Sequence, residues 1–191
     1  MPIPLLLVAS IAGTRQAPQP VLWVKPSGVI TVQGSPIQPE FTPGSKWVRM
    51  QNGFAIDIDG KRGGVRIPDL QALQLDGSIT MAGWFFLRSY VNEGPGAQIL
   101  FRGDDRIGLD PYYMAIHGDG RLYFAINSND NRSASASGEI ELGRWTRVVA
   151  NYSTETKRIN FWVNGEHVAA TKTSLLPFKQ LNTPDAPGVG I

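Results

Sequence analysis

The sequence predicts an all-β protein, an antiparallel sandwich of two sheets, from three observations. Apolar and polar residues alternate with a period of two over most of the chain after residue 50, and no ten-residue stretch has helical spacing. The 21 glycines and 14 prolines among 191 residues are typical of many tight turns. Short apolar segments recur between these turns, which is the pattern of a β-sandwich.

The N-terminal apolar run, residues 2–13, is too short to span a bilayer, which needs about 20 residues. Its length suits the hydrophobic region of a secretion signal, and Ser10-Ile11-Ala12 resembles a cleavage site. We therefore interpret residues 1–17 as a signal peptide and expect a secreted, cell-surface or periplasmic protein. A β-strand at the start of the domain is the alternative.

Prolines crowd the next part of the chain, residues 18–50. Proline is excluded from helix interiors and from central strands. We therefore expect an extended linker here, with one short strand at Val29–Gln33, and place the sandwich itself at residues 51–191.

Seven strands are predicted in that domain: Gly64–Pro68, Ser78–Arg88, Gln98–Arg102, Tyr112–His117, Arg121–Asn127, Arg144–Tyr152 and Arg158–Asn164. Ser78–Arg88 is apolar on both faces, which is typical of a central strand. Asn164-Gly165 is a two-residue hairpin turn that leads into a partner strand at His167–Ala169. The polar run Ser128–Gly138 indicates a loop.

Charge and cysteine content exclude several functions. The formal net charge of +2 is too small for a nucleic-acid-binding surface. The absence of cysteine excludes disulfides, thiolate metal sites and a cysteine nucleophile.

Four segments together resemble the laminin-G-like, concanavalin A-like jelly roll. They are Phe54–Trp84, the hairpin Gly118–Leu122, the strand Gly143–Tyr152 with its Gly-x-Trp start, and the hairpin Arg158–Ala169. The resemblance implies a jelly-roll sandwich of the bacterial, cysteine-free type. In the family a final strand follows a segment like Gly188–Ile191, which implies that this strand is missing here. Alternatively, Leu22–Val32 fills its place.

Catalytic motifs are sparse. Sugar-cleaving enzymes of this fold carry three carboxylates on one strand face. Asp57 with Asp59 and Glu139 with Glu141 each supply only two, and we interpret both pairs as surface or turn residues.

Calcium is a candidate cofactor because laminin-G-like domains often bind it through loop oxygens. The candidate ligands are Asp104, Asp105 and Asp119, since carboxylates in turns suit this cation. Plain turn formation explains the same residues.

A candidate ligand site follows from strand alternation near the end of the chain. If Ile159, Phe161 and Val148 face the core, then Arg147, Asn151, Asn160 and Trp162 share the opposite surface. An aromatic ring beside amides and a guanidinium suits a sugar, because the ring covers its apolar face while polar groups meet its hydroxyls. The alternative is that Trp162 packs beneath a loop or beneath residues 20–50.

These observations predict a non-catalytic extracellular module that binds carbohydrate or a protein partner and forms part of a larger protein. A glycan hydrolase or lyase of the same fold and a purely structural adhesion domain are the alternatives.

Overall fold

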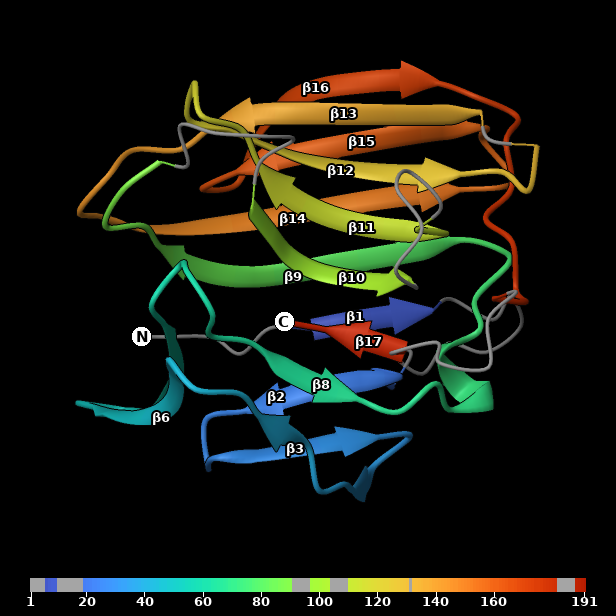
Figure 1. Ribbon diagram of the computed structural model, residues 1–191. Coiled ribbons are helices and arrows are strands. Elements are labelled where there is room, and N and C mark those ends of the chain that lie inside the picture. Colours follow the sequence, from blue (N-terminus) through green and yellow to red (C-terminus); the bar gives the residue numbers. More distant parts are fainter. Residues whose placement is uncertain (1–5, 10–18, 91–96, 104–109, 131, 182–187) are drawn as a thin grey trace.

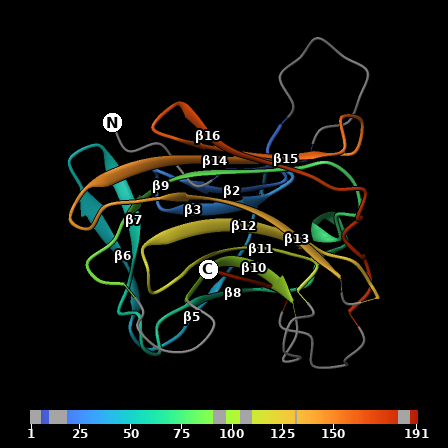
Figure 2. The ribbon, with the colours of Figure 1, turned by 90° about the horizontal axis from the view of Figure 1, so that it is seen from above.

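The computed structural model describes residues 6–9, 19–90, 97–103, 110–130, 132–181 and 188–191. The chain folds into two facing β-sheets with a separate hairpin at one end (Figures 1 and 2). All paired strands within the sheets are antiparallel. The predicted all-β, two-sheet jelly-roll sandwich is therefore confirmed.

Among the described residues, sheet A has eight strands. In spatial order they are β16 (Glu166–Lys172), β15 (Arg158–Val163), β14 (Trp145–Ser153), β9 (Ile79–Phe86), β1 (Leu6–Ala9), β2 (Leu22–Lys25), β3 (Val29–Val32) and β4 (Ser35–Pro36).

Sheet B has seven strands. They are β13 (Ser133–Glu139), β12 (Arg121–Asn127), β11 (Tyr112–Ile116), β10 (Ala97–Gly103), β17 (Gly188–Gly190), β8 (Val65–Ile67) and β5 (Glu40–Phe41). The hairpin of β6 (Ser45–Met50) and β7 (Gly53–Ile58) stands apart from both sheets. A 3-10 turn, η1 (Gln71–Leu73), precedes β9.

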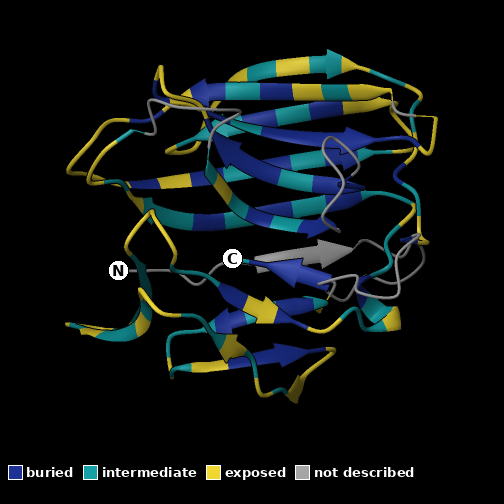
Figure 3. Cartoon of the chain, in the orientation of Figure 1, coloured by how far each residue is buried: buried dark blue, intermediate teal, exposed yellow. Residues whose placement is uncertain are grey.

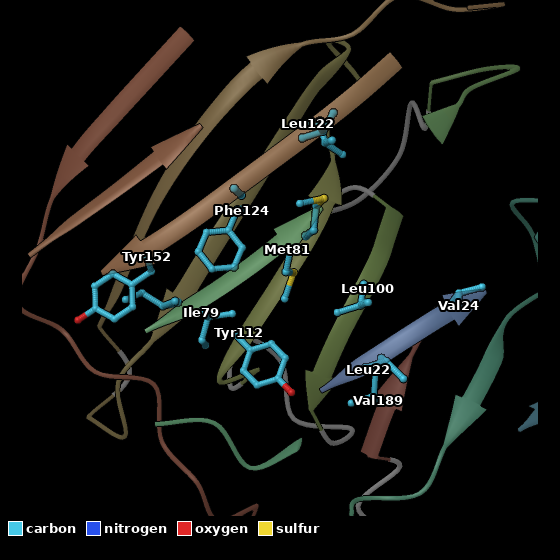
Figure 4. Packing of buried hydrophobic residues seen from close by; sticks show 14 of the residues in the cluster. Leu22, Val24, Ile79, Met81, Leu100, Tyr112, Leu122, Phe124, Tyr152 and Val189 are labelled. Atoms are coloured by element: carbon cyan, nitrogen blue, oxygen red, sulfur yellow. The ribbon is translucent and has the colours of Figure 1, made fainter. Parts of the chain in front are cut away.

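The core lies between the inner faces of the two sheets (Figures 3 and 4). Each inner strand contributes every second side chain, as the period of two predicts. From sheet A, Met81 and Phe161 are fully buried, and from sheet B, Leu122 and Phe124 meet them. Burying such side chains contributes roughly 1.5–3 kcal/mol each.

Residues 18–50 are not the extended linker that was expected, although the one strand expected there, Val29–Gln33, is present as β3. Strands β2 and β3 pair within sheet A, and their Leu22 and Ile30 are each only 1% exposed in the core. Pro26 follows β2 directly, in the turn that joins β2 to β3, and Pro36 lies in β4, at the edge of the sheet. These prolines therefore separate short strands, at positions where a missing N–H breaks no ladder.

The loop expected at Ser128–Gly138 is also partly wrong, because β13 covers most of it. Residues 133–137 alternate serine with alanine. Ala136 points into the core and Ser135 faces outward. The burial alternates as in a strand. Serine and alanine are weak strand formers, so the sequence gives little sign of this strand.

The N-terminal apolar run contributes β1, which lies between β9 and β2. Leu6–Ala9 therefore form a strand of the domain, which was the alternative to a signal peptide. The cleavage site expected at Ser10–Ala12 lies outside the described residues. At the other end of the chain, β17 has β10 and β8 as neighbours. In the described part of the chain, no helix is long and apolar enough to cross a bilayer.

Candidate ligand-binding site

The outer face of sheet A brings the four predicted ligand-binding residues together. Asn151 of β14 lies directly opposite Asn160 of β15, and Val149 lies opposite Trp162. Arg147 lies on the same face of β14, two residues before Val149. This register places the four residues on one surface, as strand alternation predicts, and their role in ligand binding stays a prediction.

His167 joins this group through the hairpin that links β15 to β16. The two-residue turn Asn164-Gly165 sets Trp162 opposite His167, and the register shifts only beyond this pair, between Trp162 and Phe161. Their ring centroids are 5.2 Å apart at an interplanar angle of 55°. We call Arg147, Asn151, Asn160, Trp162 and His167 the Trp162 face.

The two amides of the Trp162 face are oriented by hydrogen bonds. Asn151 donates from Nδ2 to the Thr80 hydroxyl at 2.8 Å. Asn160 Oδ1 lies 3.2 Å from His167 Nε2. Both amides are half-buried. Because these hydrogen bonds already orient the two side chains, the side chains lose less conformational entropy when a ligand binds.

Arg147 is exposed, and its backbone is fixed by the hairpin turn. Its N–H donates to Asn164 Oδ1 at 2.9 Å, and its carbonyl accepts from the Asn164 N–H at 2.7 Å. The guanidinium therefore projects from a rigid backbone.

Residues 20–50 do not pack over Trp162 in the described structure. Strands β2 and β3 lie on the far side of β14, β9 and β1 from β15. Trp162 is half-buried, and the ring packed against it is that of His167. The alternative in which residues 20–50 cover Trp162 is therefore wrong.

Sheet B carries a second aromatic group on its outer face, which the sequence analysis missed. The rings of Tyr113 and Tyr123 meet edge to face at 5.7 Å, and His117 stacks on Tyr123 at 4.4 Å. Burial raises the pKa of Tyr113 far above its usual range, and the neighbouring Tyr123 hydroxyl adds to this shift. Gln98 Nε2 donates to Asp110 Oδ2 at 2.5 Å beside this group. The sequence signal for this group was the presence of Tyr113 and Tyr123 at positions that alternate with the core residues of two neighbouring strands.

The first carboxylate pair has structural contacts. Asp57 forms an ion pair with Arg88 at 2.5 Å. Asp59 Oδ1 accepts three backbone N–H groups, from Lys61, Arg62 and Gly63, at 2.8–3.0 Å. These bonds lower the pKa of Asp59 to about 2, so the carboxylate stays ionised and closes a turn.

The second pair lies at the end of β13 and beyond it. Glu139 is opposite Arg121 in the β12–β13 register, and Glu141 forms an exposed ion pair with Arg144 at 2.6 Å.

Of the candidate calcium ligands, Asp104 and Asp105 lie outside the described residues. Asp119 accepts from the Arg121 N–H at 3.0 Å and from its Nε at 2.9 Å, so both carboxylate oxygens have partners. Within the described ranges, no three His, Asp or Glu side chains form a group that could hold a metal ion.

Comparison with protein families gives one match. The profile described as "Concanavalin A-like lectin/glucanases superfamily" (Laminin_G_3) matches residues 59–188. No curated protein sequence matches the chain significantly.

Several solved structures share the fold. The binding domain of Paraclostridial mosquitocidal protein 1 aligns with a TM-score of 0.62 and 10% identity, over 84% of this chain and 44% of that one. The binding domain of botulinum neurotoxin DC in complex with SialylT aligns with a TM-score of 0.62 and 15% identity, over 85% and 39%. The receptor binding domain of the botulinum neurotoxin C/D mosaic serotype aligns at 0.58 and 9% identity, over 98% and 42%. The chain thus spans less than half of each of these structures, and the likeness is one of fold.

Proposed function

This chain belongs to the concanavalin A-like lectin/glucanase superfamily, and from that premise we propose that it is a non-catalytic module that binds carbohydrate through the Trp162 face. The observation that carries the proposal is the register of β14 and β15. It sets Asn151 opposite Asn160 in the row next to Trp162, with exposed Arg147 on the same surface.

The chemistry of this surface suits a sugar. The indole of Trp162 offers an apolar plate for one face of a pyranose ring. The amides of Asn151 and Asn160 can donate to and accept from hydroxyls, and Arg147 supplies donors for an oxygen-rich or acidic substituent. Ordinary ligand sites combine apolar area with a few placed polar groups in this way.

Binding without catalysis is supported by the contacts of the candidate catalytic carboxylates. Asp57, Asp59 and Glu141 are engaged by Arg88, by backbone N–H groups and by Arg144 respectively. The structural neighbours named above are described as binding domains. A glycosidase would need at least two carboxyl groups facing one bound sugar.

The direct test is a glycan array probed with wild-type protein, Trp162→Ala, Leu176→Ala and Tyr123→Ala. Leu176 is the control, because it is an exposed large apolar side chain outside the Trp162 face. We expect wild type, Leu176→Ala and Tyr123→Ala to bind the same glycans and Trp162→Ala to lose them. Loss of binding in Tyr123→Ala, with binding kept in Trp162→Ala, would place the site on sheet B.

Two further arms test the alternatives. Each array is run with calcium and with a chelator, since we propose calcium at the loop carboxylates as an accessory ligand. Absence of binding in both conditions would favour the adhesion alternative. Mass spectrometry of bound glycans after incubation should show no shortened products, and cleavage would overturn the non-catalytic proposal.

We also propose that the module acts outside the cytoplasm as part of a larger protein. Because Leu6–Ala9 of the apolar run form β1 of sheet A, the support for this proposal is the likeness to binding domains of toxins. Cell fractionation with an antibody to the sandwich, and the size of the band it detects, test both points.

A further inference from the structure

A cavity of about 830 Å³ lies between the β6–β7 hairpin and one end of the sandwich. Pockets that hold small molecules are typically about 300–1,000 Å³. The hairpin contributes Val48, Met50 and Ala55 to the wall, and Ile99 and Ile116 of sheet B line its inner part. The wall is therefore largely apolar.

The outer rim of the cavity is aromatic and exposed. Phe54, Phe86 and Trp145 are 39%, 43% and 38% exposed. Phe86 and Trp145 are cross-strand partners with ring centroids 5.5 Å apart. Large apolar side chains that gather at a cavity mouth mark a surface that binds apolar groups.

The charges around the cavity balance. Arg88 donates to Asp57 at 2.5 Å and to the Ile58 carbonyl at 2.9 Å, which fixes the end of β7 against the segment after β9. Asp59 is held by its turn, and Lys61 is the second cation of the wall. Two acidic and two basic groups leave no net charge, so the cavity favours an uncharged apolar group.

Trp84 connects this cavity to the Trp162 face. It lies directly opposite Arg147 in the β9–β14 register and also lines the cavity. Its indole Nε1 is buried and has no hydrogen-bond partner among the described residues. A buried indole N–H normally has an acceptor, which a ligand oxygen at this junction would supply.

We infer that the ligand of the Trp162 face is a glycan that carries an uncharged alkyl or acyl chain, with the chain bound in this cavity. The inference rests on the proposed function and specifies its ligand class. Trp162 and Trp84 are two strands and one outward-facing position apart, which is roughly 10 Å across the sheet and 7 Å along it. A sugar on Trp162 thus has its linkage oxygen directed toward the Trp84 N–H and its chain toward Phe86 and Trp145.

The inference predicts that affinity depends on chain length. Burial of one methylene corresponds to about a fourfold gain at most, and ordering of the chain reduces it, so we expect roughly two- to fourfold per methylene until the cavity is full. A sugar-only ligand would show no such dependence.

The experiment measures binding of methyl, octyl and dodecyl β-D-maltosides below their micelle concentrations by isothermal titration. Tetraethylene glycol monododecyl ether serves as the sugar-free chain. Ala55→Trp fills the cavity from β7, and Trp145→Ala removes its rim. Arg49→Trp is the matched control, since Arg49 is exposed on β6 and does not line the cavity.

We expect dodecyl maltoside to bind at least about 50-fold more tightly than methyl maltoside, with the gain lost in Ala55→Trp and Trp145→Ala and kept in Arg49→Trp. Equal binding of the three maltosides, or a gain that survives both cavity variants, overturns the inference. Equal affinity for the maltoside and the sugar-free chain also overturns it, because sugar and chain would then not act together. Failure of the proposed function is distinguished by the glycan array, on which unlipidated glycans would not bind.

Discussion

Arg102 of β10 donates two parallel hydrogen bonds to Asp69, from Nε to Oδ1 at 2.7 Å and from Nη2 to Oδ2 at 2.9 Å. The guanidinium is fully buried, and Nη2 also donates to the Lys179 carbonyl at 2.6 Å. One side chain thus joins β10 to the segment before η1 and to the segment after β16. Such bidentate pairs fix geometry as well as charge.

Removing this guanidinium should be severely destabilising. Arg102→Met leaves the Asp69 carboxylate without its partner, and breaking a buried pair in this way costs about 3–5 kcal/mol. Arg121→Met is the control, because the Arg121–Asp119 pair is about half exposed on both sides, and exposed pairs of this kind contribute little to stability. Urea unfolding of both variants measures the difference, and equal losses would contradict the role of Arg102.

Gly188 should be irreplaceable in β17. Its φ is 89°, and a Cβ there would lie 2.3 Å from the Ile67 carbonyl oxygen. Gly188→Ala therefore combines backbone strain with a backbone clash, for a loss of at least about 3 kcal/mol. Gly60→Ala has a similar φ of 72° but nothing within 4 Å, so it should lose only about 1 kcal/mol. Thermal melts of the two variants test this, and similar melting temperatures would contradict it.

The free energy of unfolding should fall in acid because Asp59 becomes protonated and loses its hydrogen bonds to the backbone N–H groups. Its pKa is about 2 in the folded chain against 3.8 ordinarily, so the unfolded chain takes up a proton at higher pH. The contribution is present above about pH 4 and is lost as the pH falls toward 2. Urea midpoints measured from pH 5 to 2 should decline less steeply in Asp59→Asn than in wild type. An unchanged slope in Asp59→Asn would contradict this account.

Much of the fold could be predicted from the sequence because period-two alternation is strong in the central strands. The strand Arg121–Asn127 has the predicted bounds. The prediction of a linker was wrong because a high density of proline does not exclude strands that are short. β2 and β3 are only four residues long, and the prolines lie between such strands. β13 was missed because alternating serine and alanine carries little hydrophobic contrast.

The candidate site was partly predictable for the same reason. Alternation in β14 and β15 places Asn151, Asn160 and Trp162 on one face without knowledge of the partner strands. His167 could have been predicted by counting back from the two-residue turn at Asn164-Gly165, which sets Trp162 opposite His167. The register shift between Trp162 and Phe161 could not have been predicted, because sequence periodicity does not encode a bulge.

Asn160 should contribute to affinity and not to stability. It is half-buried on the outer face, with His167 Nε2 as its side-chain contact. Asn160→Ala should weaken glycan binding about 5- to 15-fold, the value of one or two hydrogen bonds, with a melting temperature close to that of wild type. Asn164→Ala, in the turn, should instead lower the melting temperature because it loses its bond to the Arg147 N–H. The reverse pattern would place the ligand elsewhere.

The central claim is that Trp162 is the platform for a sugar, and one titration tests it most directly. The glycan bound most strongly by wild-type protein on the array is titrated into wild type, Trp162→Ala and Trp162→Phe. We predict an affinity loss of about 10- to 100-fold in Trp162→Ala, substantial recovery in Trp162→Phe, and unchanged melting temperatures, because the ring lies outside the core. Equal affinity of Trp162→Ala and wild type would contradict the account.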